Sequence, residues 1–237
     1  MTAQRQFLAD AGHELRTPIT IIQGNLDTIA ATGDDAESLA IAADELARMT
    51  RLVDELLLLA SSERPDFLHL EPADLPAPTR SLVAKARALD GRPWVPAGTA
   101  PGTALLDPQR ITQAVMQLAA NAAAHTPAGT PVEIWSATDG TSLEFAVADH
   151  GPGIGAADRA RVFHRFARLD PRRTDGTGLG LSIVAAISAA HRGRVSVTDS
   201  AGGGATFQIA IPLVRAAEPA SPAPGGWPRH EFRRAPA

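Results

Sequence analysis

The first group of residues that could do chemistry is His13-Glu14-Leu15-Arg16-Thr17-Pro18. A neutral imidazole can attack an electrophilic phosphorus, and a carboxylate beside it can hold the other ring nitrogen and balance the charge that forms. Residues four apart share one face of a helix, so we expect His13 and Thr17 together on the solvent-facing side, with Glu14 beside them. The pattern indicates an exposed nucleophile, although an ordinary surface histidine would have the same sequence.

A second group combines an amide and a carboxylate. Asn121 lies in an alanine-rich segment typical of a buried helix, where its amide is disfavoured unless it faces a cavity or a ligand. Asp149 directly follows an apolar segment and precedes Gly151 and Gly153. A carboxylate at a strand end can accept a hydrogen bond from an exocyclic amine, and glycines let a ring approach the backbone. A structural asparagine and a simple turn are the alternatives.

The strongest indication of phosphate binding is a run of glycines that leads into an apolar helix. It consists of Gly176, Thr177, Gly178, Leu179 and Gly180. Glycines at alternate positions free backbone amides to point at anionic oxygens, and a helix N-terminus adds a favourable field. The run lacks the Gly-Lys-Ser/Thr of a P-loop and the spacing of a dinucleotide-binding turn. A flexible glycine hinge is the alternative.

Arginines precede this glycine run. Arg168, Arg172 and Arg173 lie in a polar connection that also contains Pro and Gly. Guanidinium groups bind phosphate well, so the pattern indicates a mobile lid over phosphates, although a solvated charged loop would look the same.

Two heptad patterns predict the element that carries His13. The first apolar seam contains Leu8, Leu15, Ile19, Ile22, Leu26 and Ile29. The second contains Leu39, Ala42, Leu46, Met49, Val53, Leu56 and Ala60. These seams, separated by turn-forming residues 31–35, predict a helical hairpin. A hairpin of this size buries little apolar surface alone, so we predict a dimeric four-helix bundle.

The heptads end near residue 64, where we place a domain boundary. Residues 65–214 are predicted to form an α/β domain, with a helix at 107–124 and strands at 132–137, 143–149, 194–198 and 206–212. From residue 215 to residue 237 the chain is rich in Pro, Ala and Gly, and we expect a disordered tail.

Composition excludes several classes of protein. The chain has 237 residues, 22 basic and 26 acidic side chains and no cysteine. The slightly negative charge argues against nucleic-acid binding, and the lack of cysteine excludes disulfides and thiolate chemistry. The longest apolar run, at 56–60, is far shorter than the roughly 20 residues that cross a bilayer. We expect a cytoplasmic chain without a membrane segment of its own, any membrane tether lying upstream of it.

The order and spacing of these groups resemble the transmitter module of a sensor histidine kinase, from about Thr2 to Leu213. The matching segments are His13–Pro18 (H box), Asn121 (N box), Asp149–Gly153 (G1 box), Phe163–Phe166 (F box), Gly176–Gly180 (G2 box) and the final glycine-rich turn Gly202–Phe207. The resemblance implies an α+β architecture. A dimerisation and phosphotransfer hairpin, residues 1–64, would precede an α/β sandwich ATP-binding domain of the Bergerat type, residues 65–214.

The resemblance also implies roles for the hairpin residues and an activity. His13 would be the phosphoacceptor, Glu14 its acid/base partner, and Thr17 would orient water when the phosphorylated regulator is dephosphorylated. The expected activity is ATP-dependent autophosphorylation of His13 within a homodimer. The phosphoryl group would then pass to an aspartate on the receiver domain of a response regulator.

For the nucleotide site, the resemblance implies that Asn121 coordinates the Mg²⁺ that bridges the ATP phosphates. Asp149 would receive the adenine amino group, with Gly151 and Gly153 near the ring. The residues expected at the phosphates are Arg168, one of Arg172 and Arg173, and Gly176, Thr177, Gly178, Leu179 and Gly180.

Some positions depart from the family pattern. Gln117 stands where asparagine is usual, Ala124 where a basic residue is usual, His125 where an aromatic residue is frequent, and Gly12 where serine or alanine is usual. These departures leave open a regulator phosphatase and a nucleotide-binding pseudokinase scaffold with weak autokinase activity. A plain ATPase or serine-directed kinase with the same glycine motifs would leave the hairpin unexplained.

Overall fold

The computed structural model of the chain describes residues 2–32, 36–169 and 176–214. Side chains are described within these ranges from residue 11 on, except those of His13 and residues 30–32. The predicted tail at 215–237 and the predicted lid residues Arg172 and Arg173 lie outside the described residues.

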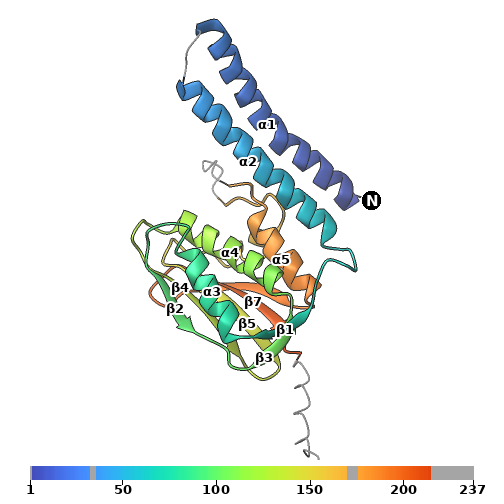
Figure 1. The fold of residues 1–237 in the computed structure, drawn as a ribbon, viewed down its shortest axis with the longest axis vertical. Coiled ribbons are helices and arrows are strands. Elements are labelled where there is room, and N and C mark those ends of the chain that lie inside the picture. Colours follow the sequence, from blue (N-terminus) through green and yellow to red (C-terminus); the bar gives the residue numbers. More distant parts are fainter. Residues whose placement is uncertain (1, 33–35, 170–175, 215–237) are drawn as a thin grey trace, which may run out of the picture.

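Two long antiparallel helices form the N-terminal region (Figure 1). α1 spans Thr2–Thr32 and α2 spans Ala36–Ser61. Apolar residues at steps of three and four give each helix an apolar stripe along which the two helices pack. The predicted helical hairpin is confirmed. In the described part of the chain, no helix is both long and apolar enough to cross a membrane.

An α/β domain follows the hairpin. Its elements are β1 (Glu71–Asp74), α3 (Pro76–Ala86), β2 (Trp94–Gly98), β3 (Thr103–Leu106), α4 (Pro108–His125), β4 (Val132–Thr138), β5 (Ser142–Ala148), the 3-10 turn η1 (Arg161–Phe163), α5 (Gly180–Ala190), β6 (Arg194–Asp199) and β7 (Ala205–Pro212). The main sheet has the order β2-β4-β5-β7-β6, and β1 pairs with β3 in a separate antiparallel ribbon. In the main sheet, β2 runs parallel to β4 and the other pairs are antiparallel.

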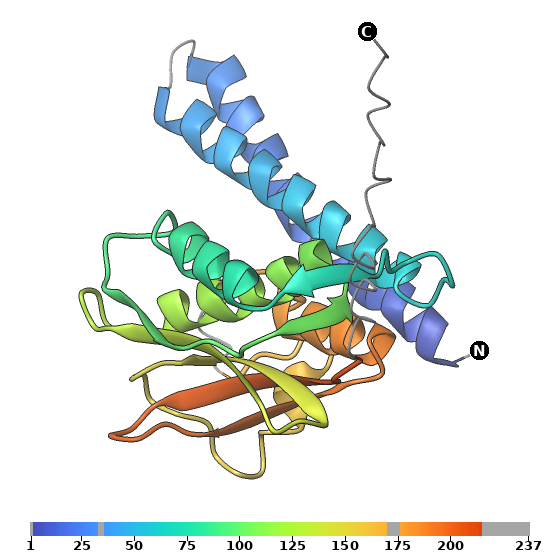
Figure 2. The ribbon, with the colours of Figure 1, turned by 60° about the horizontal axis from the view of Figure 1, so that its bottom comes forward.

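The three helices of this domain cover one face of the main sheet, which makes a two-layer sandwich (Figures 1 and 2). Its core lies between the layers. Ile134, Phe145 and Phe207 enter it from the strands, and Ile111 and Ile183 enter it from α4 and α5, all fully buried. The predicted α/β sandwich is confirmed.

The start of α4 is fixed by hydrogen bonds around Asp107. Its Oδ1 accepts from the Arg110 backbone N–H at 2.9 Å, as an N-cap does, and its Oδ2 accepts from the His69 N–H at 2.9 Å. The Asp107 N–H donates to Nε2 of the buried His191 at 3.1 Å. Burial lowers the pKa of the His191 imidazole because it disfavours the charged form. This anchored helix carries Gln117 and Asn121.

The hairpin rests on the α/β domain through the C-terminal half of α2. Leu52, Leu58 and Leu59 are buried and belong to the same apolar cluster as the domain core. α2 packs there against α5. The hairpin therefore lies over the helical layer of the sandwich (Figure 2).

Candidate active site

A pocket of about 540 Å³ lies where α4, the loop after β5, the loop before α5 and the hairpin helix α2 come together. Of the residues that the sequence assigned to a nucleotide site, those lining it are Asn121, Asp149, Gly153, Arg168, Gly176, Thr177, Gly178 and Gly180. These residues are spread over 60 positions of the chain, from Asn121 to Gly180. Their convergence supports a single binding site.

Asp149 forms one wall of the pocket just after β5. Its side chain is only 3% exposed. Its Oδ1 accepts hydrogen bonds from the Gly151 N–H at 2.8 Å and the Ala205 N–H at 3.1 Å. Among the described residues, no donor reaches its Oδ2. A buried carboxylate held in one orientation, with an acceptor to spare, can receive an amino group from a ligand.

Two of the predicted glycines are required by the geometry. A Cβ at Gly151 would lie 2.7 Å from the His125 carbonyl oxygen, at the end of α4. Gly178 has a φ of +72°, and a Cβ there would lie 3.0 Å from Cα of Phe166. Gly151 thus supports the Asp149 carboxylate, while Gly178 lets the glycine-rich turn pack closely against the F-box segment.

Leu179 supports the pocket from behind. Its side chain is fully buried in the core, and its backbone N–H donates to Oγ1 of Thr177 at 3.3 Å. It anchors the glycine-rich turn and the start of α5, so its contribution to the pocket is indirect.

Asn121 is half-buried on α4 and lines the pocket. Its amide makes no hydrogen bond to any described residue. The described residues contain no group of three or more acidic or histidine side chains that could hold a metal. Mg²⁺ in nucleotide sites takes few protein oxygens and completes its shell with phosphates and water, so a single amide oxygen suits it. The Asn121 side chain fits this role.

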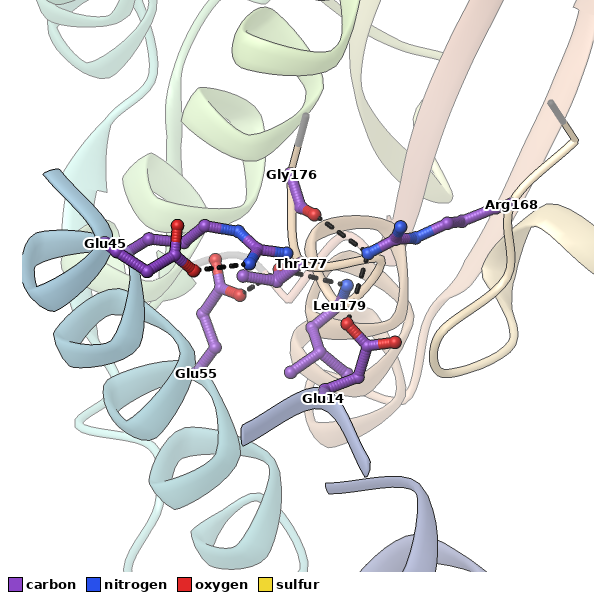
Figure 3. A network of polar contacts seen from close by, with 8 residues as sticks. Glu14, Glu45, Glu55, Arg168, Gly176, Thr177 and Leu179 are labelled. Carbon is purple, nitrogen blue, oxygen red and sulfur yellow. Dashed lines mark hydrogen bonds and ion pairs between the residues drawn. The ribbon is translucent and has the colours of Figure 1, made fainter. Parts of the chain in front are cut away.

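Gln117, one turn before Asn121, connects α4 to the hairpin. Its Nε2 donates to Oε1 of Glu55 at 3.3 Å. The other oxygen of that carboxylate, Oε2, accepts from Oγ1 of Thr177 at 2.5 Å (Figure 3). A Cβ at Gly180 would lie 2.7 Å from Oε1 of Gln117, so the glycine makes room for the longer side chain. Glu55 was missed from the sequence, because an acidic residue on the polar side of a heptad pattern is ordinary.

Glu14 reaches the pocket only through a contact with the lining residue Arg168. One guanidinium nitrogen of Arg168, Nη2, donates to Oε2 of Glu14 at 3.2 Å and to the Gly176 carbonyl at 3.1 Å (Figure 3). Glu14 is therefore only partly exposed, because Arg168 of the α/β domain contacts that part of α1. Thr17 is exposed as expected, and the side chain of His13 lies outside the described ones.

Comparison with known protein families supports this interpretation. Residues 3–65 match the His Kinase A (phospho-acceptor) domain. Residues 106–215 match the Histidine kinase-, DNA gyrase B-, and HSP90-like ATPase family.

Individual curated relatives of the chain are also histidine kinases. The chain is 39% identical over 221 residues to the probable sensor histidine kinase TcrY of Mycobacterium tuberculosis, covering 90% of this chain and 46% of TcrY. It is 34% identical over 220 residues to the sensor-like histidine kinase SenX3 of Mycolicibacterium smegmatis, covering 88% of this chain and 57% of SenX3. The chain thus spans about half the length of the relatives it matches.

Solved structures show the same architecture. Full-length ShkA in complex with AMPPNP is 32% identical, with a TM-score of 0.64 over 90% of this chain and 46% of ShkA. The histidine kinase ThkA in complex with the response regulator TrrA is 22% identical and shares the fold, with a TM-score of 0.73 over 88% of this chain and 61% of that chain. The chain therefore belongs to the sensor histidine kinases of two-component systems and contains their transmitter module.

Proposed function

We propose that this chain transfers the γ-phosphoryl group of ATP to His13. The observation that carries the proposal is the contact between Glu14, the sequence neighbour of His13, and Arg168 on the pocket rim. This contact brings the helix of the candidate phosphoacceptor to the mouth of the pocket that holds Asn121 and Asp149. Phosphoryl transfer depends mainly on such positioning and on charge neutralisation.

The pocket residues orient ATP by binding its adenine at one end of the pocket and its phosphates at the other. Oδ2 of Asp149 accepts a hydrogen bond from the adenine amino group, and Gly153 lies beside the ring. The backbone of the turn from Gly176 to Gly180 faces the phosphates, where the N-terminus of α5 favours negative charge. Asn121 holds Mg²⁺, which when bound neutralises part of the phosphate charge.

The reaction exchanges one bond to phosphorus for another. A lone pair on a ring nitrogen of His13 forms the new bond to the γ-phosphorus, while the bond to the β,γ-bridging oxygen breaks and ADP leaves. The Glu14 carboxylate accepts a hydrogen bond from the other ring N–H and balances the imidazolium charge. Arg168, and one of Arg172 and Arg173, contact the phosphates, so Glu14 and ATP compete for Arg168.

We propose that the active form is a homodimer, because each hairpin seam is only half used within one chain. Leu15, Ile22, Ile29, Ala42, Met49 and Leu56 are partly buried. The alternate seam positions, Ile19, Leu26, Leu39, Leu46 and Val53, are between 41% and 59% exposed. A second hairpin packed on these positions would complete a four-helix bundle.

The natural acceptor of the phosphoryl group is an aspartate on a response regulator. The exposed position of Thr17, one turn after His13, leaves this part of α1 accessible to a protein partner and to the water that dephosphorylation needs. The relative ThkA was solved with such a regulator. We also propose a cytoplasmic site of action, where ATP is available.

The test is incubation of the chain with γ-labelled ATP and Mg²⁺, followed by acid and alkali treatment. We expect label that is acid-labile and alkali-stable, as a phosphoramidate is, and no label in His13→Gln. Asn121→Ala should also abolish labelling. Label retained by His13→Gln would contradict the phosphoacceptor assignment, and undiminished label in Asn121→Ala would contradict the Mg²⁺ role.

A further inference from the structure

One arginine that lines the pocket belongs to the hairpin. Arg51, on α2, lines the pocket together with Glu55, Asn121 and Thr177. Its guanidinium group has no hydrogen bond or ion pair with any described residue. We propose that Arg51 is a phosphate-binding residue of the nucleotide site, supplied by the phosphotransfer hairpin rather than by the ATP-binding domain. This inference rests on the proposed ATP-binding function.

The position of Arg51 on α2 places it at the phosphate end of the pocket. Arg51 and Glu55 are four residues apart in one helix, so they occupy neighbouring turns of the same face. Glu55 is hydrogen-bonded to Thr177, in the glycine-rich turn, and to Gln117, one turn before Asn121. Asp149, the candidate partner of adenine, contacts neither of these hairpin residues.

The orientation of this face is fixed by packing. Leu52, the residue after Arg51, is buried in the cluster that α2 shares with the α/β domain. Leu46 and Val53, which belong to the exposed seam, lie on another side of the same helix. Arg51 therefore remains directed at the pocket when a second hairpin covers the seam.

The side chains that line the pocket provide few positive charges for binding phosphate. Two carboxylates line it, on Glu55 and Asp149, and Ala124 on its wall is uncharged. Of the two arginines among the described lining residues, Arg168 already contacts Glu14. A guanidinium group binds phosphate oxygens through two parallel N–H donors, and it is less costly to desolvate than an ammonium group. Arg51 can do this without breaking an existing ion pair.

Arg51 would couple nucleotide binding to the docking of the hairpin on the α/β domain. Because Arg51 lies on the hairpin, its contact with phosphate forms only when the hairpin is docked over the pocket. The contact also strengthens with the number of phosphates on the ligand. ATP would therefore favour the docked arrangement more than ADP does, and adenosine would not favour it at all.

The test measures calorimetric affinities for ATP, ADP and adenosine with the whole chain, for the parent, Arg51→Ala and Arg51→Lys. Arg80→Ala is the matched control, since Arg80 is an exposed arginine of α3 outside the pocket. We expect Arg51→Ala to bind ATP roughly tenfold more weakly, ADP less so, and adenosine unchanged. Arg51→Lys should recover part of the loss, and Arg80→Ala should match the parent.

Parent-like ATP binding by Arg51→Ala would overturn the inference, as would an equal loss for adenosine, which would indicate a structural defect. Failure of the proposed function has a different signature. A parent chain that binds ATP but gives no label on His13 contradicts the kinase assignment, while the ratio of ATP to adenosine affinities still tests Arg51. A parent chain that binds no nucleotide would overturn both.

Discussion

The hairpin and the α/β domain bury their apolar residues very differently. In the domain, large side chains such as Phe145, Phe207 and Leu118 are fully buried between sheet and helices. In the hairpin, Leu26, Leu39 and Leu46 are at least half exposed. One region completes its core within the chain, and the other leaves half of its seam exposed. The exposed seam is thus the proposed dimer interface, while the buried core of the α/β domain supports most of the pocket.

The contacts between the two regions are of two kinds. Apolar residues near the end of α2 join the domain core, which fixes the hairpin at one end. Nearer the pocket the contacts are polar and partly exposed, between Glu14 and Arg168 and between Glu55 and its two partners. Partly exposed polar contacts contribute little stability, so they can be exchanged for contacts with ATP during the reaction.

The largest effect is expected in the self-contained core. Phe145→Ala empties a fully buried site in the central strand β5 and should lower the free energy of unfolding of the domain by about 3–5 kcal/mol. Urea denaturation monitored by tryptophan fluorescence measures it. Leu89→Ala, at an exposed site, is the control and should change it by less than about 0.5 kcal/mol. A small effect of Phe145→Ala would contradict the description of the core.

A charged side chain in the exposed seam of the hairpin should weaken the proposed dimer and leave the α/β domain folded. Leu46→Glu would place a carboxylate at the proposed dimer interface and should raise the dimer dissociation constant at least about 100-fold. Light scattering after size exclusion measures the mass. Ala47→Glu, exposed and outside the seam, should remain dimeric. A parent chain that is monomeric at high concentration would contradict the proposed dimer interface. Unfolding of the α/β domain by Leu46→Glu would contradict the separation of that interface from the domain core.

Acid should weaken the domain through His191. Its pKa is lowered by burial, so below the ordinary value of 6.5 the unfolded chain binds a proton that the folded chain does not. Stability should therefore fall as the pH falls through 6.5 and level off below the folded-state pKa, with a slope of at most about 1.4 kcal/mol per pH unit. Denaturation at several pH values should show a flatter profile for His191→Gln, and an unchanged slope in that variant would contradict the prediction.

The smallest effect is expected at the junction of the two regions. Gln117→Asn shortens the side chain by one methylene, so the amide no longer reaches Glu55, and the contact is lost at a cost of about 0.5–1 kcal/mol. Hydrogen exchange of the α2 amides should become a few-fold faster, because α2 is held less firmly on the domain. The same change in a Glu55→Gln background should add little, and full additivity would contradict the contact.

Much of the fold follows from local patterns in the sequence. The heptads predicted both hairpin helices, and the ends of the predicted helix at α4 and of strands β4 to β7 lie within one residue of those observed. No helix or strand was predicted for the segment from β1 to β3. There, prolines stand inside β1 and β2 and at the start of α3, and β2 is a short edge strand whose parallel pairing with β4 is nonlocal.

The candidate site could be predicted where a residue is unusual for its surroundings. An asparagine among alanines, a carboxylate after an apolar strand and a run of glycines all stand out. Glu55 and Arg51 do not, because charged residues are normal on the outer side of an amphipathic helix. Only the packing of α2 onto the domain turns that side towards the pocket, and packing between distant segments has no local pattern.

We propose above that His13, on the hairpin, receives phosphate from ATP held by the α/β domain. Mass-spectrometric mapping of the intact chain after incubation with ATP and Mg²⁺, kept at alkaline pH to preserve phosphoramidates, tests it most directly. We expect phosphate on His13 and on none of the other six histidines. Phosphate on a serine, a threonine or another histidine, or none on a chain that binds ATP, would contradict it.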